Sequence, residues 1–480
     1  MIDRRQFMLV SAVGAAGIAV GCSSRTAEAP AETPAAAPAP PAVDLSFGPA
    51  ETDIDLGGVT VRTWAYNGRV PGNEIRIRKG QTLRAAVTNK LPAETSIHWH
   101  GIAIVNDMDG VPPLTQSPIP AGGDFTYEYT VPDAGTYWYH SHVGTQLDRG
   151  LYGPLIVEDP DEQADYDDEL VLVLDDWIDG TGTNPDQVLA DLRKNGMAPM
   201  GPGGPGVSPT TPLGEDGGDV TYPYFVINGR VPTDPEVRDS RVGQRIRLRV
   251  INAGSDTSFR VAVPDTTLNV IATDGYPVMP AQAKSVILGM GERFDATFTV
   301  NGSVPVVAVP YGKPGHAQLN IRVDGKPSTV NVDDFVAAVN NEIPLDTATL
   351  SPTPEVTLPA RTPDQVIDAR LSGPVNGYTW PFNGILYDPT KDGIGVKRDQ
   401  RVRMRMINES MMYHPIHLHG HTFEVVGRDG PKARKDTVLV PPKQTVEVDF
   451  QTDNPGKWIT HCHNTYHLEA GMAGWIFYED

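Results

Sequence analysis

The stretch RIRLRVIN at residues 245–252 recurs as RVRMRMIN at residues 401–408, and arginine alternates with apolar side chains along both. Alternation with a period of two places the two kinds of side chain on opposite faces of a β-strand. We therefore expect two strands, each with its apolar face in a core and its arginine face in water. Forty-eight glycines and 44 prolines supply the turns that many short strands need, which favours an all-β fold.

Both stretches follow an Asn-Gly pair, and a third such pair opens a similar segment nearer the N-terminus. The pairs belong to YNGRVPG, INGRVPT and FNGILYD, at residues 67–68, 228–229 and 383–384. The number of residues between successive Asn-Gly pairs is far larger than the roughly 20–50 residues of a solenoid repeat, so the pairs indicate three similar domains. We expect β-sandwiches or β-barrels at residues 45–160, 165–325 and 345–480.

Charge and cysteine content restrict the classes of protein that remain. The formal net charge of −21 argues against a nucleic-acid partner, which would require basic stripes. The acidic balance favours encounter with cationic substrates, although it identifies no reaction. The two cysteines, Cys22 and Cys462, are too few and too far apart to form a disulfide framework.

The first 44 residues are predicted to direct export and to tether the protein. Paired arginines at positions 4 and 5 precede an apolar stretch, residues 8–20, that is too short to span a bilayer. This signal peptide, residues 1–22, resembles the twin-arginine type that carries folded proteins; a general secretory signal is the alternative. AVGC at residues 19–22 resembles a lipoprotein cleavage box, and residues 23–44 form an Ala/Pro-rich linker. We expect a periplasmic or cell-surface protein, anchored through a lipidated Cys22 or released by cleavage elsewhere.

Ten of the 12 histidines lie in four short motifs that indicate metal binding. The motifs are HWHG at 98–101, HSH at 140–142, HPIHLH at 414–419 and HCHNTYH at 461–467. Each contains a His-x-His pair, and in a strand such a pair presents two imidazoles on one face. So many imidazoles would fill a core poorly without a metal ion, and imidazole suits zinc, copper, iron and nickel.

Strand parity divides the ligands near the C-terminus into two sets. His461 and His463 share one face, so Cys462 faces the other way, and His414 faces away from His417 and His419. A loop carries His467 and Met472 back over the cysteine side. A cysteine with two histidines and a distant methionine is the composition of a blue-copper electron-transfer site. Zinc is the competing metal, but it has no redox chemistry and leaves the other eight histidines unexplained.

The four motifs resemble those of multicopper oxidases, the family of laccases, ascorbate oxidase and bacterial copper-tolerance oxidases. The resemblance covers nearly the whole chain after the linker and implies three consecutive cupredoxin-like Greek-key β-barrels that hold four copper ions. It implies type 1 copper on His414, Cys462, His467 and Met472. It implies type 2 copper on His98 and His417, and type 3 copper on His100, His140 and His463 for one ion and on His142, His419 and His461 for the other.

The resemblance also implies an oxidase that uses O₂. One-electron oxidation of a small substrate at the type 1 copper would be coupled to four-electron reduction of O₂ to water at the other three coppers. Cys462 is bonded directly to His461 and His463, which gives a short covalent path between the two sites. Asp109, in MDGVPP, matches the acidic residue that family members keep beside the cluster, and we expect it to donate protons. The alternative for Asp109 is an ordinary Asp-Gly turn.

Two further positions concern proton supply and substrate access. Many bacterial members carry a glutamate directly after the second type 1 histidine; here that residue is Leu468. Period-two parity would point Glu469 the wrong way to replace it. Asp436, in KDTVLVPP, is expected either to help line the substrate approach or to lie on a surface loop.

The function predicted from these features is that of a laccase-type oxidase acting on phenols, aromatic amines or low-valent metal ions. A Cu(I) oxidase for copper tolerance would use the same coppers, although the chain lacks an obvious methionine-rich segment. A non-enzymatic protein with this fold would have lost ligands, whereas this chain retains them all. An enzyme like copper nitrite reductase would have two domains and fewer histidine pairs.

Overall fold

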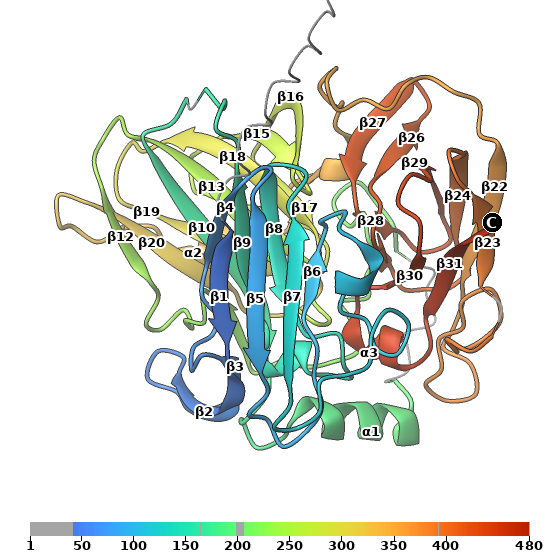
Figure 1. Ribbon diagram of the computed structural model, residues 1–480. Helices are drawn as coiled ribbons and strands as arrows, with labels where there is room; N and C mark the ends of the chain where they lie inside the picture. The colour runs from blue at the N-terminus through green and yellow to red at the C-terminus, as the bar shows by residue number, and fades with distance from the viewer. Residues whose placement is uncertain (1–41, 164, 198–205, 392, 480) are drawn as a thin grey trace, which may run out of the picture. The chain divides into compact units, whose positions relative to one another are not determined.

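The computed structural model describes residues 42–163, 165–197, 206–391 and 393–479, and the structural statements below refer to these residues. The predicted signal peptide, Cys22 and most of the predicted linker lie outside them. The described chain is largely β-strand (Figure 1). None of its helices combines the length and the apolar character needed to cross a membrane.

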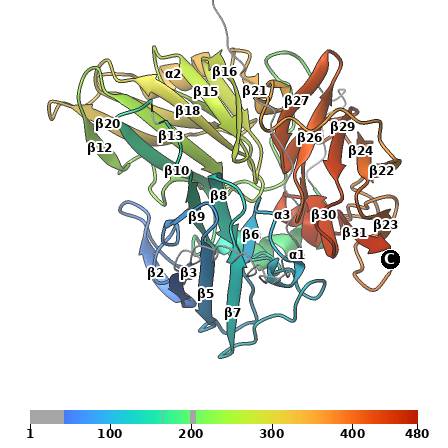
Figure 2. The same cartoon turned by 45° about the horizontal axis from the view of Figure 1, so that its top comes forward.

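The strands form three sets, here called the first domain (β1–β9), the second domain (β10–β21) and the third domain (β22–β31). In Figure 2 the first domain is coloured blue to cyan, the second green to yellow and the third orange to red. The first domain has sheets ordered β1-β5-β7 and β4-β9-β8-β6 and the pair β2-β3. Its strands are β1 Val43–Phe47, β2 Pro49–Asp55, β3 Thr60–Tyr66, β4 Ile75–Arg78, β5 Thr82–Thr88, β6 His98–His100, β7 Asp124–Thr130, β8 Gly135–His140 and β9 Tyr152–Glu158.

The second domain has two six-stranded sheets, ordered β11-β10-β13-β18-β15-β16 and β12-β20-β19-β14-β17-β21. The strands of the first sheet are β10 Asp168–Trp177, β11 Tyr224–Ile227, β13 Arg245–Asn252, β15 Leu268–Thr273, β16 Tyr276–Ala283 and β18 Arg293–Thr299. Those of the second sheet are β12 Val237–Ser240, β14 Phe259–Ala262, β17 Ser285–Leu288, β19 Val304–Pro310, β20 Ala317–Val323 and β21 Leu345–Asp346.

The third domain has two five-stranded sheets, ordered β22-β24-β29-β26-β27 and β23-β31-β30-β25-β28. The strands of the first sheet are β22 Gln365–Leu371, β24 Arg401–Asn408, β26 Phe423–Gly427, β27 Gly430–Lys435 and β29 Thr445–Gln451. Those of the second sheet are β23 Ile394–Lys397, β25 His414–Leu418, β28 Thr437–Val440, β30 Lys457–Cys462 and β31 Ala473–Glu479.

The internal repeat extends from the sequence to the strand topology. The strands predicted at 245–252 and 401–408 are confirmed as β13 and β24. Each has one parallel neighbour, β10 or β22, and one antiparallel neighbour, β18 or β29. In the first domain, β5 has the same arrangement between parallel β1 and antiparallel β7. The predicted all-β architecture of three similar domains is therefore the observed one.

The prediction that arginines of these strands face water is wrong for β13. Arg247 and Arg249 are only 5% and 3% exposed. Arg247 Nη2 donates to Asp295 Oδ2 at 2.6 Å, and Arg249 Nε donates to Glu169 Oε2 at 2.6 Å. Arg249 Nη1 also donates to Thr136 Oγ1 of the first domain at 2.9 Å. The polar face of β13 is buried because carboxylates and another domain cover it, which strand periodicity alone does not reveal.

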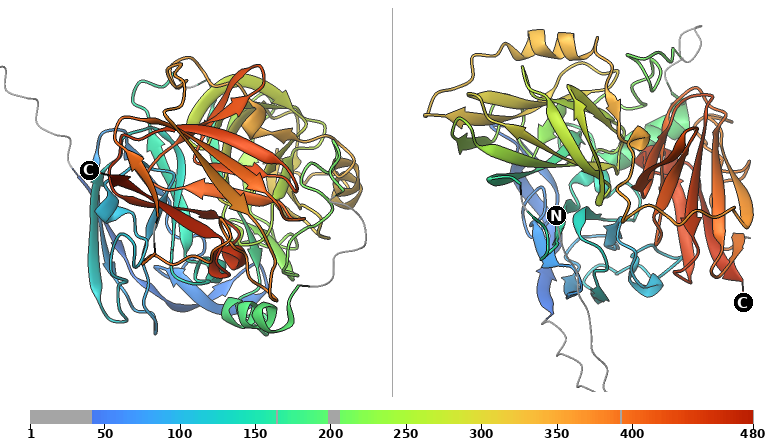
Figure 3. Two further views of the ribbon diagram at one scale, coloured as in Figure 1. Left: turned by 90° about the vertical axis from the view of Figure 1, so that its right-hand side faces the viewer. Right: turned by 90° about the horizontal axis from the view of Figure 1, so that it is seen from above.

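Three α-helices and three short 3₁₀ turns connect the described strands. Helix α1 (Pro185–Asn195) begins after Asn184, whose side chain caps the first turn. Helix α3 (Thr465–Glu469) lies beside α1, and Arg193 Nη2 donates to the carbonyl oxygen of Glu469 at 2.5 Å (Figure 1 and Figure 3). The remaining elements are α2 Val332–Val339, η1 Asn106–Met108, η2 Leu147–Arg149 and η3 Thr347–Thr349.

Candidate metal centres

Three side chains of the third domain meet around Cys462. His414 begins β25, Cys462 ends β30, and His467 lies on α3. Cys462 Sγ is 3.6 Å from Nδ1 of each histidine, and the two Nδ1 atoms are 3.1 Å apart. All three residues are fully buried. We call His414, Cys462 and His467 the cysteine group; its atoms lie close enough to hold one metal ion.

Neighbouring side chains fix the orientation of the cysteine group. Ser410 Oγ lies 2.8 Å from Nε2 of His414, which leaves Nδ1 of that ring facing Cys462. Asn464 caps α3 by accepting hydrogen bonds from the backbone N–H groups of Tyr466 and His467. Met472 is buried, and its carbonyl oxygen accepts from the N–H of Cys462 at 3.0 Å. The methionine predicted to complete this set is thus held beside it through the backbone.

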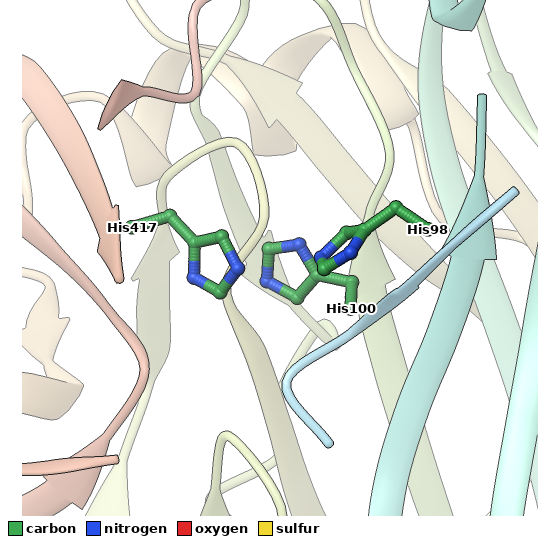
Figure 4. A group of neighbouring side chains, drawn as sticks. All are labelled: His98, His100 and His417. Carbon is green, nitrogen blue, oxygen red and sulfur yellow. The ribbon is translucent and has the colours of Figure 1, made fainter. Parts of the chain in front are cut away.

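Eight further histidines form a second cluster, four from the first domain and four from the third. They are His98, His100, His140, His142, His417, His419, His461 and His463, here called the histidine cluster. The pairing of β6 with β8 sets His98 opposite His140, and that of β25 with β30 sets His417 opposite His461. The ligand nitrogens lie within 4.8 Å of one another in each of three sets. These sets are His98/His100/His417, His100/His140/His463 and His142/His419/His461. The rings of the first set face one another across the boundary between the two domains (Figure 4).

One nitrogen of many of these rings is held by the protein while the other has no protein partner. Nδ1 of His98, His140 and His417 each contacts a backbone carbonyl oxygen at 2.8 Å. The opposite Nε2 atoms of these three rings are buried and have no hydrogen-bond partner. Nδ1 of His100 and both nitrogens of His463 are also buried without a partner. Because buried polar atoms are normally paired, this arrangement fits ligands of a metal ion.

Burial also keeps these rings in the form that binds metals. Desolvation lowers the pKa of His100, His140, His142, His419 and His463 well below the usual value, and neighbouring histidines lower it further. For the same reasons the pKa of His461 falls to about 3. The rings are therefore neutral near pH 7, and neutral imidazole is the ligand for divalent metals.

Asp109 lies between the two domains and touches ligands from both. Its carboxylate accepts from Nδ1 of His419 at 3.0 Å, and its carbonyl oxygen accepts from Nδ1 of His98 at 2.8 Å. Asp109 is 1% exposed. The next residue, Gly110, has a φ of 81°, and a Cβ there would overlap the backbone of Ile97. Glycine therefore lets this turn press against β6, so the turn itself places the carboxylate beside the cluster.

Asp436 neither lines a substrate approach nor lies on a surface loop, and both expectations were wrong. It is fully buried, and its Oδ1 atom lies 3.1 Å from Nε2 of His100. Its carbonyl oxygen accepts from Nδ1 of His417. Arg293 of the second domain forms two hydrogen bonds with its carboxylate, and this pairing holds the pKa of Asp436 well below its ordinary value against the effect of burial. The cation that permits this burial lies 143 residues away in the sequence, so local pattern could not reveal it.

A cavity of about 420 Å³ leads toward the histidine cluster and is lined by residues that include Glu94, His142, Leu468 and Glu469. An adjoining smaller hollow is lined by His140, His142, His461 and His463, again with Leu468 and Glu469. The expectation that Glu469 points the wrong way was therefore incorrect. Residues 465–469 are helical, so the parity of an extended strand does not apply to them.

Asp219 is a neighbour of the cysteine group that the histidine and cysteine motifs do not reveal. Its Oδ2 atom lies 3.0 Å from Nε2 of His467 and also accepts from the hydroxyl of Tyr378 at 2.5 Å. Its side chain is fully buried, and Oδ1 has no partner. The only signal in the sequence was the acidic segment EDGGD at residues 215–219.

The strands and histidine sets together define a copper oxidase of three cupredoxin-like domains. Three models of the multicopper oxidase family match the chain in series, at residues 50–162, 168–307 and 360–480. The chain belongs to the multicopper oxidase family. It is an oxidoreductase that uses O₂ and small reducing substrates and takes copper as its cofactor.

Individual relatives agree with this assignment. Multicopper oxidase MmcO of Mycobacterium tuberculosis is 42% identical over 506 residues, which cover 98% of this chain and 96% of that protein. Copper resistance protein A of Pseudomonas syringae pv. tomato is 28% identical over 564 residues, which cover 89% of this chain and 91% of that protein. The crystal structure of a multi-copper oxidase from Pseudomonas thermotolerans is 28% identical with a TM-score of 0.70, and the match covers 91% of this chain and 99% of that one.

Proposed function

We propose that the chain binds four copper ions, one in the cysteine group and three in the histidine cluster. The thiolate, two imidazoles and a nearby methionine suit a type 1 copper, and the inward-facing imidazoles suit the other three. The type 1 ligands are His414, Cys462, His467 and Met472. The type 2 ligands are His98 and His417. The type 3 ligands are His100, His140 and His463 for one ion and His142, His419 and His461 for the other.

The residues between the two sites join them by short bonded paths. When bound, copper supplies the one-electron redox chemistry and the capacity to reduce O₂. Cys462 is linked by peptide bonds to His461 on one side and His463 on the other. Nδ1 of His461 also contacts the carbonyl oxygen of Cys462 at 2.9 Å, which adds a hydrogen-bonded path. Electrons can therefore pass from the cysteine group to the histidine cluster along covalent and hydrogen bonds, with no through-space gap.

Reduction of O₂ to water also consumes protons, and Asp109 is the residue that we assign to supply them. Its carboxylate contacts His419 at the buried end of the site, and a carboxyl group can both hold and release a proton there. The cavity beside His142 and Glu469 provides a route for small molecules between solvent and this region. Asp109 thus acts within reach of the reacting atoms.

We infer that the physiological electron donor is a low-valent metal cation such as Cu(I). The observation that carries this inference is the contact of Asp219 with His467, with a second oxygen of the carboxylate left unpaired. His467 and the side chain of Asp219 are both fully buried, so neither donor touches this pair, and the buried negative charge favours the approach of a cation over that of a neutral phenol. The net charge of −21 adds a long-range attraction for cations. The name of the related copper resistance protein A agrees with such a donor.

Replacing Asp219 with asparagine should lower kcat/KM for Cu(I) about 10-fold, because the local negative charge that attracts the cation is lost. The value for a bulky phenol should change by less than about 2-fold, since a neutral donor gains little from that charge. Steady-state O₂ consumption with each donor measures both values. Asp265→Asn, which makes the same change on an exposed turn of the second domain, is the matched control. Equal losses with both donors would contradict a cation site.

The oxidase assignment itself is tested on the purified, copper-loaded protein. We expect four coppers per chain, a blue colour from the Cys462 thiolate bound to Cu(II), and O₂ consumption with Cu(I) or a phenol. A colourless protein that retains no copper would contradict the oxidase assignment for every electron donor.

We also propose that the protein acts outside the cytoplasmic membrane, exported through the twin-arginine signal and anchored by lipid at Cys22. The arginine pair, the short apolar stretch and the AVGC box support this placement. In fractionated cells, Cys22→Ala should move the protein from the membrane to the soluble exported fraction. An unchanged membrane fraction would contradict the lipid anchor.

A further inference from the structure

The second domain supplies no member of the cysteine group or the histidine cluster, yet a turn of its described chain presses against the cluster. Gly291 in that turn has a φ of 86°. A Cβ there would lie 2.7 Å from Cδ2 of His463 and 3.1 Å from Cε1 of His100. The residue must therefore be glycine for the turn to pack against both rings. The turn leads directly into β18, whose first residue is Arg293.

Arg293 joins all three domains at one buried point. The residue is fully buried. Its Nη1 and Nη2 atoms donate to Oδ1 and Oδ2 of Asp436 in the third domain, at 2.7 and 2.6 Å. Its Nε atom donates to the carbonyl oxygen of Thr136 in the first domain at 3.1 Å. Two parallel hydrogen bonds from a planar guanidinium fix both the position and the rotation of the Asp436 carboxylate.

Asp436 passes this constraint to two rings of the cluster. Its Oδ1 atom accepts from Nε2 of His100 at 3.1 Å, and its carbonyl oxygen accepts from Nδ1 of His417 at 2.8 Å. The opposite atoms, Nδ1 of His100 and Nε2 of His417, face inward without a protein partner. One residue thus selects which nitrogen of each ring is left free to bind a metal ion.

The backbone next to His100 is shaped to admit the ion pair. Gly101 has a φ of 87°, and a Cβ there would lie 2.6 Å from Oδ2 of Asp436 and would overlap Nη2 of Arg293. Any larger residue at 101 would push the guanidinium and the carboxylate away from the ring. Gly101 therefore leaves room for the ion pair, and Gly291 leaves room for the rings of His100 and His463.

Stability alone is a poor reason for this arrangement. Two buried cations, Arg293 and Lys435, lie among three buried carboxylates, those of Asp274, Glu292 and Asp436. Removing such charges from water is costly, and well-packed apolar side chains are often as stable. A better explanation for this network is that it fixes the orientation of the histidine rings beside it, those of His100 and His417.

We propose that Arg293 is a positioning residue through which the second domain holds His100 and His417 in the orientation that retains copper. This inference rests on the proposed four-copper site. It gives the second domain, which contributes no side chain to either metal group, a direct role in keeping the histidine cluster in its metal-binding geometry.

The test is copper retention by Arg293→Gln during dialysis against a graded chelator series, with copper per chain measured at each step. We expect the chelator concentration that removes one copper to fall about 10–100-fold, as is usual when a residue behind a metal ligand is lost. The blue absorption of the cysteine group should persist, and the type 2 signal in electron paramagnetic resonance should weaken. Retention equal to wild type in the folded variant would overturn the proposal.

The matched control is Arg247→Gln, which removes another buried arginine of the second domain. Arg247 pairs with Asp295 and Glu162, and none of these contacts a histidine. If the two variants lose copper equally, a general loosening of the domain explains the result and the positioning role is overturned. Loss confined to the Arg293 variant supports it.

Arg293→Lys extends the test if the glutamine variant does not fold. Lysine keeps the buried charge but cannot make two parallel hydrogen bonds to one carboxylate. A folded, blue lysine variant with weakened copper retention supports the proposal, and one with full retention overturns it. Wild-type protein that lacks the four coppers would instead refute the proposed function before any variant is compared.

Discussion

Replacing Cys462 with serine should abolish the blue colour and reduce O₂ consumption to the level of copper-free protein. The thiolate is the ligand that defines the cysteine group, and a hydroxyl in its place binds copper poorly. The three coppers of the histidine cluster should remain, because Cys462 faces away from them. Absorption spectra, copper per chain and O₂ uptake measure the three outcomes.

Thr460→Ser provides the control for this substitution. Thr460 lies on the same strand, is fully buried, and contributes to neither metal group. This variant should stay blue and active, because it removes one methyl group and no ligand. A blue, active Cys462→Ser protein would show that the electrons enter elsewhere.

Replacing Asp109 with asparagine should lower kcat by about 10²- to 10⁴-fold, the range expected when a general acid is lost. Asparagine can still accept a hydrogen bond from His419, so the orientation of that ring should be preserved. It cannot deliver a proton. The colour and the four coppers should therefore be retained, and substrate should still bleach the blue absorption at the normal rate.

Reoxidation of the fully reduced Asp109→Asn protein by O₂ isolates the affected step. We expect slow return of the blue colour after a normal bleaching phase. Asp107→Asn, two residues earlier and exposed, makes the same charge change away from the ligands and should behave like wild type. If both variants reoxidise at the wild-type rate, Asp109 is a structural turn residue, as the simpler interpretation of its Asp-Gly sequence would have it.

Elementary strand geometry accounts for how much of the site could be predicted from the sequence. Alternate residues of a strand face opposite ways, so the side chain of Cys462 must point away from those of His461 and His463. The structure places the sulfur with His414 and His467 and turns the two neighbouring rings toward the first domain. The same periodicity identified β13 and β24 from their alternating arginines.

The features that could not be predicted depend on contacts between distant segments. Asp436 is buried because Arg293 lies against it, and Arg249 is buried because Glu169 does. Nothing within a few residues of either position encodes those partners. Glu469 was misplaced for a different reason: the short helix after Cys462 changes the direction of successive side chains, and five residues are too few to show helical periodicity.

The histidine cluster draws on two parts of the chain that are 319 residues apart at the contact of His142 with His461. During synthesis the first four histidines leave the ribosome long before the last four exist. A chain that stops before His417 therefore has only half of the cluster, however well its earlier domains have folded. Because the last ligands to be made complete the cluster, a metal ion that needs histidines from both domains can bind there only after His463 has been synthesised.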